Sequence, residues 1–206
     1  LRPMFTSCCP GWVRFLKSQY PHLVPQLSTA KSPQQMFGSV MKSYFAESIG
    51  VKPENMFTVS IMPCVAKKGE SNMELFYGEY AGHETDVVLT TRELTRMIRS
   101  AHIDPASLVD RECDPLMKEW TGAGVIFGTT GGVMEAALRT VYRVLEGKEA
   151  PADFYQLRPV RGLNNRKEAE VTIAGKNLRV CILYGTAAAE EFLAEDMSGY
   201  HFVEVM

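Results

Sequence analysis

Strand-like and helix-like segments alternate along this chain, and this alternation limits its fold more than any other feature. Residues 56–62 and 86–90 carry apolar runs typical of strands, and residues 201–205 form another near the end. Residues 171–173 and 178–183 flank Ala174-Gly175-Lys176-Asn177, which predicts a hairpin. We therefore predict an α/β fold, with a mostly parallel or mixed sheet of about four strands flanked by helices.

Helices are predicted where apolar residues recur at helical spacing between recognisable end signals. Ser32 is typical of an N-cap because Pro33 follows it, and Thr90 with Glu93 forms a capping-box pattern. Gly147 is a predicted helix stop after a glycine-rich stretch and an apolar face. The predicted helical segments are residues 12–20, 33–49, 91–98, 133–146 and 187–195.

Composition excludes several classes of protein. The 206 residues suffice for one substantial core, so residues 1–206 are predicted to form a single α/β lobe. The formal net charge is −2, no Lys/Arg cluster occurs, and no apolar run is long enough to span a bilayer. We therefore expect a soluble, cytoplasmic chain with no nucleic-acid or membrane partner, and a periplasmic location is the alternative.

The five cysteines are too few for a disulfide framework, and their odd number argues against complete internal pairing. A reducing compartment or a metal role is the better interpretation. The chain begins at Leu1 without a signal-type segment. It is expected either to have lost a leader or to have been cut from a longer protein.

The segment Thr6-Ser7-Cys8-Cys9-Pro10-Gly11-Trp12 carries the most informative residues. Adjacent cysteines rarely bridge each other, and the proline fixes the backbone after them, so two sulfurs leave one rigid turn in different directions. One thiolate could bind a soft metal or an iron–sulfur cluster while the other carries protons. The alternative is a pair of small buried hydrophobic residues.

A second segment, Met62-Pro63-Cys64-Val65-Ala66-Lys67-Lys68-Gly69-Glu70, joins a thiol, a cation and a carboxylate in one short stretch. Lys67 lies three positions after Cys64, and Glu70 lies six positions after it. This combination suits an anionic metal centre. The alternative is a solvated surface pair of Lys67 and Glu70.

Together the two segments resemble the first two signature motifs of the iron-only ([FeFe]) hydrogenases. The resemblance extends through further stretches and covers essentially the whole chain: Ser28-Thr29-Ala30-Lys31-Ser32-Pro33-Gln34-Gln35, Leu89-Thr90-Thr91-Arg92-Glu93-Leu94 and Phe127-Gly128-Thr129-Thr130-Gly131-Gly132-Val133-Met134-Glu135-Ala136-Ala137. It implies one lobe of a two-lobed catalytic domain and an oxidoreductase that reduces protons reversibly to H2.

The resemblance also implies a cofactor, the H-cluster, in which a [4Fe–4S] cubane is joined to a two-iron azadithiolate unit. By resemblance, Cys9 and Cys64 ligate the cubane, and Cys8 stays off the metal and passes protons to the two-iron unit. A thiol with a reference pKa of about 8.5 suits that task. Ser28 matches a hydroxyl on the family's proton path.

The remaining site residues are assigned by the same resemblance. Lys67 matches the residue that hydrogen-bonds a cyanide ligand, and Glu70 is a motif residue with either a catalytic or a loop-supporting role. Ser32 and Pro63 fall where the family contacts the other cyanide or nearby diatomic ligands. The residues expected to pack around the two-iron unit are Met62, Gln34 and Phe127.

Glu204-Val205-Met206 matches the beginning of the family's third motif, and the sequence stops before that motif's cysteines. We therefore expect Met206 to lie near the cofactor, and expect this chain alone to be metal-free and inactive. The implied partners are a ferredoxin or similar electron carrier, the remainder of the catalytic domain, and maturation proteins.

Three alternatives remain open. The glycine-rich stretch at 128–132 could cradle a phosphate, although it matches neither the P-loop nor the dinucleotide pattern. A hydrogenase-like iron–sulfur assembly protein, or a sensory hydrogenase, could use the same scaffold, but Cys8 and Lys67 favour the enzyme. Cys113 is predicted to be a loop thiol and Cys181 a core residue, and neither is expected to complete the cluster.

Overall fold

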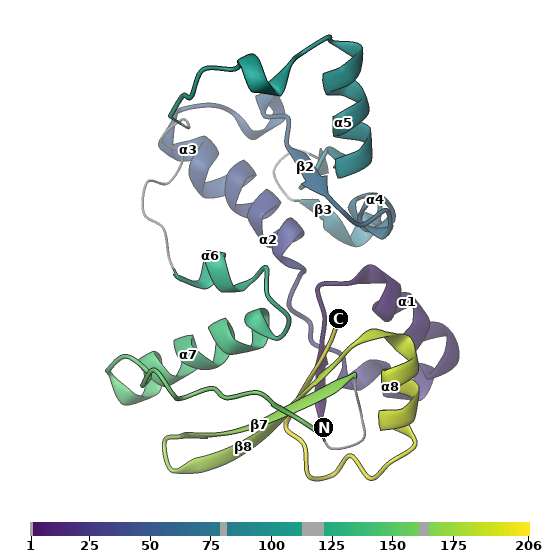
Figure 1. Ribbon diagram of the computed structural model, residues 1–206, viewed down its shortest axis with the longest axis vertical. Helices are drawn as coiled ribbons and strands as arrows, with labels where there is room; N and C mark the ends of the chain where they lie inside the picture. Colours follow the sequence, from purple (N-terminus) through teal and green to yellow (C-terminus); the bar gives the residue numbers. More distant parts are fainter. Residues whose placement is uncertain (1, 79–81, 113–121, 161–164) are drawn as a thin grey trace. The chain divides into compact units, whose positions relative to one another are not determined.

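The computed structural model describes residues 2–78, 82–112, 122–160 and 165–206 (Figure 1). Backbone contacts divide the chain into two compact units. The first unit comprises Leu1–Ser7, Trp12–Thr29 and Leu116–Met206, and the second unit comprises Cys8–Gly11 and Ala30–Pro115. The sequence predicted one lobe for residues 1–206, whereas the contacts separate two units. That these residues form one lobe of a larger catalytic domain stays a prediction.

The first unit contains a mixed five-stranded sheet in the order β1-β9-β8-β7-β6. Strand β9 pairs in parallel with β1 and β8, and the remaining neighbours are antiparallel. The sheet is mixed, as predicted, but β1 was not predicted because three residues show no periodicity. The strands are β1 (Met4–Thr6), β6 (Arg158–Pro159), β7 (Arg166–Ile173), β8 (Lys176–Leu183) and β9 (Phe202–Val205).

Helices α7 and α8 lie on opposite sides of this sheet (Figure 1). Alternate residues of the strands face the two sides, and the α7 side carries a core cluster that includes Met134, Leu138, Val180 and Ile182. Helix α7 contributes residues four apart, which lie on one face. The helical elements of this unit are α1 (Pro10–Gln19, whose first residues group with the second unit), η1 (Pro21–Gln26), α6 (Gly122–Ile126), α7 (Gly132–Glu146) and α8 (Gly185–Leu193).

The second unit is built around two short parallel strands and the helices that connect them. Strand β2 pairs with β5 in parallel, and β3 pairs with β4 antiparallel. Its strands are β2 (Val59–Met62), β3 (Tyr77–Gly78), β4 (Gly82–His83) and β5 (Val87–Thr90). Its helices are α2 (Pro33–Val40), η2 (Met41–Phe45), α3 (Ala46–Ser48), η3 (Pro53–Asn55), α4 (Ala66–Ser71), η4 (Glu74–Phe76), α5 (Thr91–Ser100) and η5 (Pro105–Ser107).

The local end signals are confirmed where the backbone satisfies them within a few residues. The side chain of Thr90 accepts from the backbone N–H of Glu93, whose carboxylate accepts in return from the Thr90 N–H, so α5 begins with a full capping box. Helix α7 ends at Gly147, whose φ is +67°. The β7–β8 hairpin turns at Ala174 and Gly175, both with positive φ.

Two apolar segments are more exposed than their patterns predicted. The strand predicted at 56–62 begins only at Val59, because Thr58 bonds to Asp86 through side-chain and turn contacts instead of a regular ladder. Val59 and Ile61 are half exposed. The apolar stripe of α2 is also exposed at Met36 and Phe37. Periodicity therefore located these elements correctly without identifying what covers them.

Within the described residues, every helix is too short or too polar to traverse a lipid bilayer.

Candidate functional site

Four of the predicted site residues meet at one buried carboxylate in the second unit. Glu70 Oε2 accepts hydrogen bonds from Ser32 Oγ at 3.0 Å, Gln34 Nε2 at 3.2 Å and Lys67 Nζ at 3.0 Å. We call these four residues the Glu70 network. The stretch that opens α2 and the helix α4 thus meet at one charged group.

The local structure explains why these side chains face inward. Ser32 has the extended backbone of an N-cap before Pro33, as predicted, but its hydroxyl makes no capping bond and donates to Glu70 instead. The Gln34 amide has a second partner, because its Oε1 accepts from Ser60 Oγ of β2 at 2.8 Å. Ser60 was missed by the sequence analysis, although a polar residue within an apolar strand was a usable signal.

The burial of the Glu70 network overturns one alternative for this pair. Lys67 and Glu70 are each only 6% exposed, so a solvated surface pair is wrong. An ammonium carries three N–H donors, and the contacts found within the described residues use one of them on Glu70. A buried cation with donor capacity remaining is suited to an anionic ligand.

Cys64 lies in the turn between β2 and α4, one residue after the exposed Pro63 and two after Met62, the last residue of β2. The turn is closed by a hydrogen bond from the backbone N–H of Lys67 to the Cys64 carbonyl at 3.3 Å. The thiol and the buried ammonium are therefore held on one tight turn. Cys64 is partly exposed.

Cys8 and Cys9 precede Pro10, the first residue of α1, and both are partly exposed thiols. Backbone contacts group Cys8–Gly11 with Ala30–Pro115, so both cysteine turns belong to the second unit. At Gly11 an added Cβ would lie 3.3 Å from Cys9 Sγ, so the turn leaves little space beside that sulfur.

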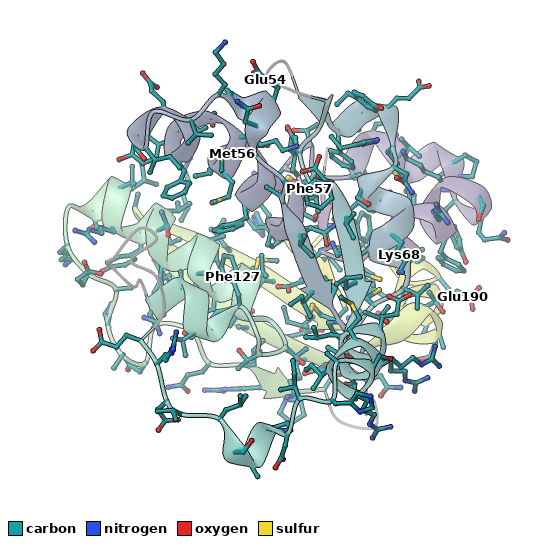
Figure 2. All side chains as sticks on the ribbon, turned by 90° about the horizontal axis from the view of Figure 1, so that it is seen from above. Glu54, Met56, Phe57, Lys68, Phe127 and Glu190 are labelled. Carbon is teal, nitrogen blue, oxygen red and sulfur yellow. The ribbon has the colours of Figure 1, made fainter. Side chains whose placement is uncertain are left out.

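Three predicted site residues, Ser28, Phe127 and Met206, belong to the first unit. The Ser28 N–H donates to the Phe5 carbonyl of β1 at 2.7 Å. Phe127 directly follows α6 and is 38% exposed (Figure 2). The Met206 N–H donates to the Leu183 carbonyl of β8 at 2.9 Å, and its side chain packs against the α7 core cluster.

The first and third motifs leave the sheet of the first unit at the same edge. Strands β1 and β9 run parallel with Thr6 opposite Glu204, and Ser7 Oγ donates to the Val205 carbonyl at 2.7 Å. The carboxyl ends of adjacent parallel strands are the usual location of binding sites in α/β sheets. The sequence analysis missed this pairing because it did not identify β1.

The second unit also holds a neighbouring lysine with a different environment. Lys68, which is labelled in Figure 2, lies next to Lys67 in α4 and pairs with Glu93 of α5 at 2.7 Å. Hydrogen bonds from Lys68 and from Thr90 lower the pKa of Glu93 to about 2. Lys68 and Glu93 are both more than a third exposed, so this pair ties two helix starts together near solvent.

The two remaining cysteines differ in what can be said of them. Cys181 is completely buried in β8, and burial raises the pKa of its thiol to about 12, so the prediction of a core residue is confirmed. Cys113 lies outside the described residues.

Thiols at two turns and a buried ammonium match an anionic iron–sulfur centre in the kinds of group that they offer. Within the described ranges, however, no three His, Cys, Asp or Glu side chains gather in a group able to hold a metal ion.

Comparison with protein families matches residues 1–206 to the model "Iron only hydrogenase large subunit, C-terminal domain". Among curated proteins, Iron hydrogenase 1 of Clostridium pasteurianum is 47% identical over 99% of this chain and 36% of the relative. The periplasmic [Fe] hydrogenase large subunit of Nitratidesulfovibrio vulgaris is 44% identical over 99% of this chain and 48% of the relative. The chain therefore spans half or less of the length of these relatives.

Among solved structures, apo [FeFe]-hydrogenase HydA1 from Chlamydomonas reinhardtii matches with a TM-score of 0.81 and 38% identity, covering 99% of this chain and 58% of that one. Less similar relatives include a cytosolic Fe-S cluster assembly factor of Xenopus tropicalis, 32% identical over 99% of this chain and 44% of the relative. The same scaffold therefore occurs in proteins named for two different tasks.

Proposed function

Because this chain belongs to the family of iron-only hydrogenase large subunits, as part of their C-terminal domain, we propose that it helps to hold an H-cluster at which protons are reduced reversibly to H2. We propose further that residues 1–206 form part of a larger catalytic domain. An anionic iron–sulfur centre needs soft ligands, cationic hydrogen-bond donors and a route for protons.

The observation that carries this proposal is the buried Lys67–Glu70 pair on the Cys64 turn. Burying an ammonium is unfavourable unless its charge is compensated, and Glu70 supplies that compensation on one side. The remaining N–H groups of Lys67 are assigned to a cyanide ligand of the two-iron unit. Glu70 is assigned to hold the ammonium in place, which favours a supporting role over a catalytic one.

The cysteines divide between ligation and proton transfer. Cys9 and Cys64 are proposed as two cubane ligands, since thiolates are the usual ligands of such clusters. Cys8, beside Cys9 in the same turn, is proposed to carry protons, with Ser28 as the next hydroxyl on the path. Both assignments draw on the family motif and on the grouping of the two turns in one unit.

The remaining residues would surround the cofactor. Ser32 and Pro63 are assigned to diatomic ligands; Ser32 donates its one O–H to Glu70 in this structure, so the hydroxyl would turn from Glu70 to donate to such a ligand. The residues assigned to pack around the two-iron unit are Met62, Gln34, Phe127 and Met206. When bound, the cluster supplies the electron transfer and the iron-centred bond chemistry, and the protein positions and shields it.

The electron donor that we propose is a ferredoxin or a similar one-electron carrier, and maturation proteins would insert the two-iron unit.

A second candidate function is iron–sulfur cluster assembly, which the 32% identical relative favours. Cys8 and Lys67 discriminate between the two, because an assembly protein needs neither a proton-carrying thiol nor a cyanide-binding ammonium.

The decisive experiment uses the complete product of the gene, reconstituted with iron and sulfide and then with a synthetic two-iron precursor. We expect bound iron, a reducible cubane signal by electron paramagnetic resonance, and H2 from reduced methyl viologen. Iron binding without any H2 would instead support the assembly function.

Two pairs of variants separate the roles. Cys64→Ser should lose most of the iron, whereas Cys181→Ala, which removes a buried thiol in β8, should keep it. Lys67→Met should abolish H2 production, whereas Lys68→Met, one residue away and paired with Glu93, should retain it. Equal losses in both members of a pair would contradict the assignment.

A further inference from the structure

Glu204 of β9 is the most deeply buried carboxylate among the described residues, at 1% exposure. It lies in the middle of the sheet, opposite Thr6 of β1 and Ile182 of β8. Its Oε2 accepts a hydrogen bond from the backbone N–H of Met134 at 2.9 Å. Met134 belongs to the first turn of α7, where backbone N–H groups lack partners within the helix.

The electrostatic setting of Glu204 is unusual for a buried acid. Within the described ranges it forms no ion pair, and the group that its carboxyl faces is the positive end of a 15-residue helix. Burial raises its pKa to about 7, against the effect of the Met134 hydrogen bond. Glu204 is therefore buried at an energetic cost, and it joins strand β9 to helix α7 in the first unit.

Two proposed cofactor contacts lie directly on either side of this junction. Met206 lies one residue past the end of β9 and two residues after Glu204, and it packs against the core cluster that contains Met134. On the helix side, a Cβ at Gly132 would lie 1.6 Å from the Ile126 carbonyl oxygen, so α6 and α7 are in direct backbone contact. Phe127 follows Ile126 at that point.

The same junction is fixed from the neighbouring strand. A Cβ at Gly131 would lie 3.1 Å from Ile182 Cγ1, and Ile182 is the residue of β8 that pairs with Glu204. The Gly131 φ of +79° also favours glycine. The start of α7 therefore rests on β8 through the close approach of Gly131 to the Ile182 side chain, and on β9 through the Glu204 carboxylate.

We infer that Glu204 is a positioning residue, whose hydrogen bond to the first turn of α7 sets the spacing between Met206 just after β9 and Phe127 before α7. The contact between Glu204 and Met134 stands on the geometry of the first unit alone. Its consequence for the cofactor rests on the proposed function. The two parts are tested separately.

The first test measures amide exchange at Met134 by NMR or mass spectrometry in the protein without cofactor. Glu204→Ala removes the acceptor, so we expect exchange at Met134 to become about fivefold to tenfold faster, as for a lost helix cap. Glu204→Gln keeps an acceptor oxygen and should stay within about twofold of the wild type. Glu135→Gln is the matched control, because it removes a charge from the same turn but leaves this contact intact.

The second test measures the infrared bands of the carbonyl and cyanide ligands after reconstitution of the complete gene product. Glu204→Ala should shift or broaden these bands, whereas Glu204→Gln and Glu135→Gln should match the wild type. Unchanged Met134 exchange in Glu204→Ala would overturn the contact itself. Faster exchange with unchanged bands would overturn the positioning role.

Two further outcomes are also decisive. If Glu204→Gln disturbs the infrared bands as much as Glu204→Ala does, while Met134 stays protected in Glu204→Gln, then the charge of Glu204 affects the cofactor. This outcome would overturn the positioning role. If the wild type loads no cofactor at all, the proposed function fails, and the exchange test still decides the contact. Circular dichroism of each variant identifies any that does not fold. If Glu204→Ala does not fold, Met134 exchange is measured in Glu204→Gln, and exchange outside the twofold limit would overturn the contact.

Discussion

Each unit contains a charged network around a buried cation, and the two cations differ in how many of their N–H donors have partners. In the second unit, the Glu70 network has one cation, one carboxylate and two polar donors. In the first unit, five residues form what we call the Arg166 network: Arg166, Glu168, Arg179, Glu195 and Tyr200.

Arg166 uses its guanidinium fully. It donates to Glu168, Glu195 and the Tyr200 hydroxyl, and it lies over the Phe192 ring at 4.9 Å. Although burial opposes it, hydrogen bonds from Tyr200 and Arg179 lower the pKa of Glu168. Lys67, by contrast, has a single acceptor among the described residues.

The difference separates a structural network from a candidate binding site. A planar guanidinium in a complete set of acceptors holds strands and a helix end together, whereas an ammonium with remaining donors is prepared for a ligand. We therefore expect substitutions in the Arg166 network to lower stability, and substitutions in the Glu70 network to affect function more than stability.

The largest effect on stability is expected for Arg166→Met. It leaves Glu168 with Arg179 as its one cation among the described residues and removes the ring contact with Phe192, so the free energy of unfolding should fall by about 3 kcal/mol. Urea unfolding measures this. Arg143→Met, which breaks an exposed pair with Glu149, should cost less than about 0.5 kcal/mol. Similar losses in both variants would contradict the distinction between the networks.

A pH effect of about 2 kcal/mol is expected from Glu204, the buried carboxyl of the first unit that lies outside the Arg166 network. Its pKa is raised from 4.5 to about 7, so the folded state binds the proton more tightly. The resulting stabilisation is fully present below pH 4.5 and is lost as pH rises through about 7. Between pH 5 and pH 7 the free energy of unfolding should therefore fall by about 2 kcal/mol from this group.

Glu204→Gln should remove that part of the pH dependence, and the difference between the two unfolding curves isolates it. Glu168, whose pKa is lowered, contributes with the opposite sign and at lower pH. A wild type and a Glu204→Gln variant with parallel curves from pH 5 to pH 7 would contradict the raised pKa.

Sequence alone located features whose signals lie within a few residues of each other. The capping box at Thr90 and the stop at Gly147 are local backbone arrangements, so their patterns were sufficient. The resemblance assigned Ser32, Gln34 and Glu70 to one site, and the structure brings these three side chains together, whereas their role at a cofactor stays a prediction.

The burial and partners of these groups could not be predicted, because they depend on segments far apart in the chain. Glu70 meets Ser32 across 38 positions, and Glu204 meets Met134 across 70. A three-residue strand such as β1 carries no periodicity, so its parallel pairing with β9 was also hidden. Tertiary packing decided each of these cases.

Ser32→Ala should have a smaller effect on stability. It removes one of three donors to Glu70, and the lost hydrogen bond is expected to cost about 1 kcal/mol in the free energy of unfolding. Ser48→Ala is the control, since that exposed hydroxyl donates to a carbonyl three residues earlier. This substitution should change the free energy of unfolding by close to zero. A Ser32→Ala variant as stable as Ser48→Ala would mean that the Ser32 bond does not support the Glu70 network.

A net effect on stability of at most about 1 kcal/mol is expected for the double variant Lys67→Met with Glu70→Gln. Lys67→Met alone leaves a buried carboxylate without its cation and should cost about 2 kcal/mol or more in the free energy of unfolding. Replacing both charges leaves an amide beside Ser32 and Gln34, so the double variant should unfold within about 1 kcal/mol of the wild type. A double-mutant cycle in urea gives the coupling.

The same double variant should produce no H2 after reconstitution, because no ammonium remains to meet an anionic ligand. Restored stability without restored activity would mean that the Lys67–Glu70 pair is needed for ligand binding and not for folding. The Arg166 network, in contrast, is expected to be needed for folding. If the double variant were active, the ammonium would have no role at the cofactor. If it were as unstable as Lys67→Met alone, the Glu70 network would be structural in the same sense as the Arg166 network.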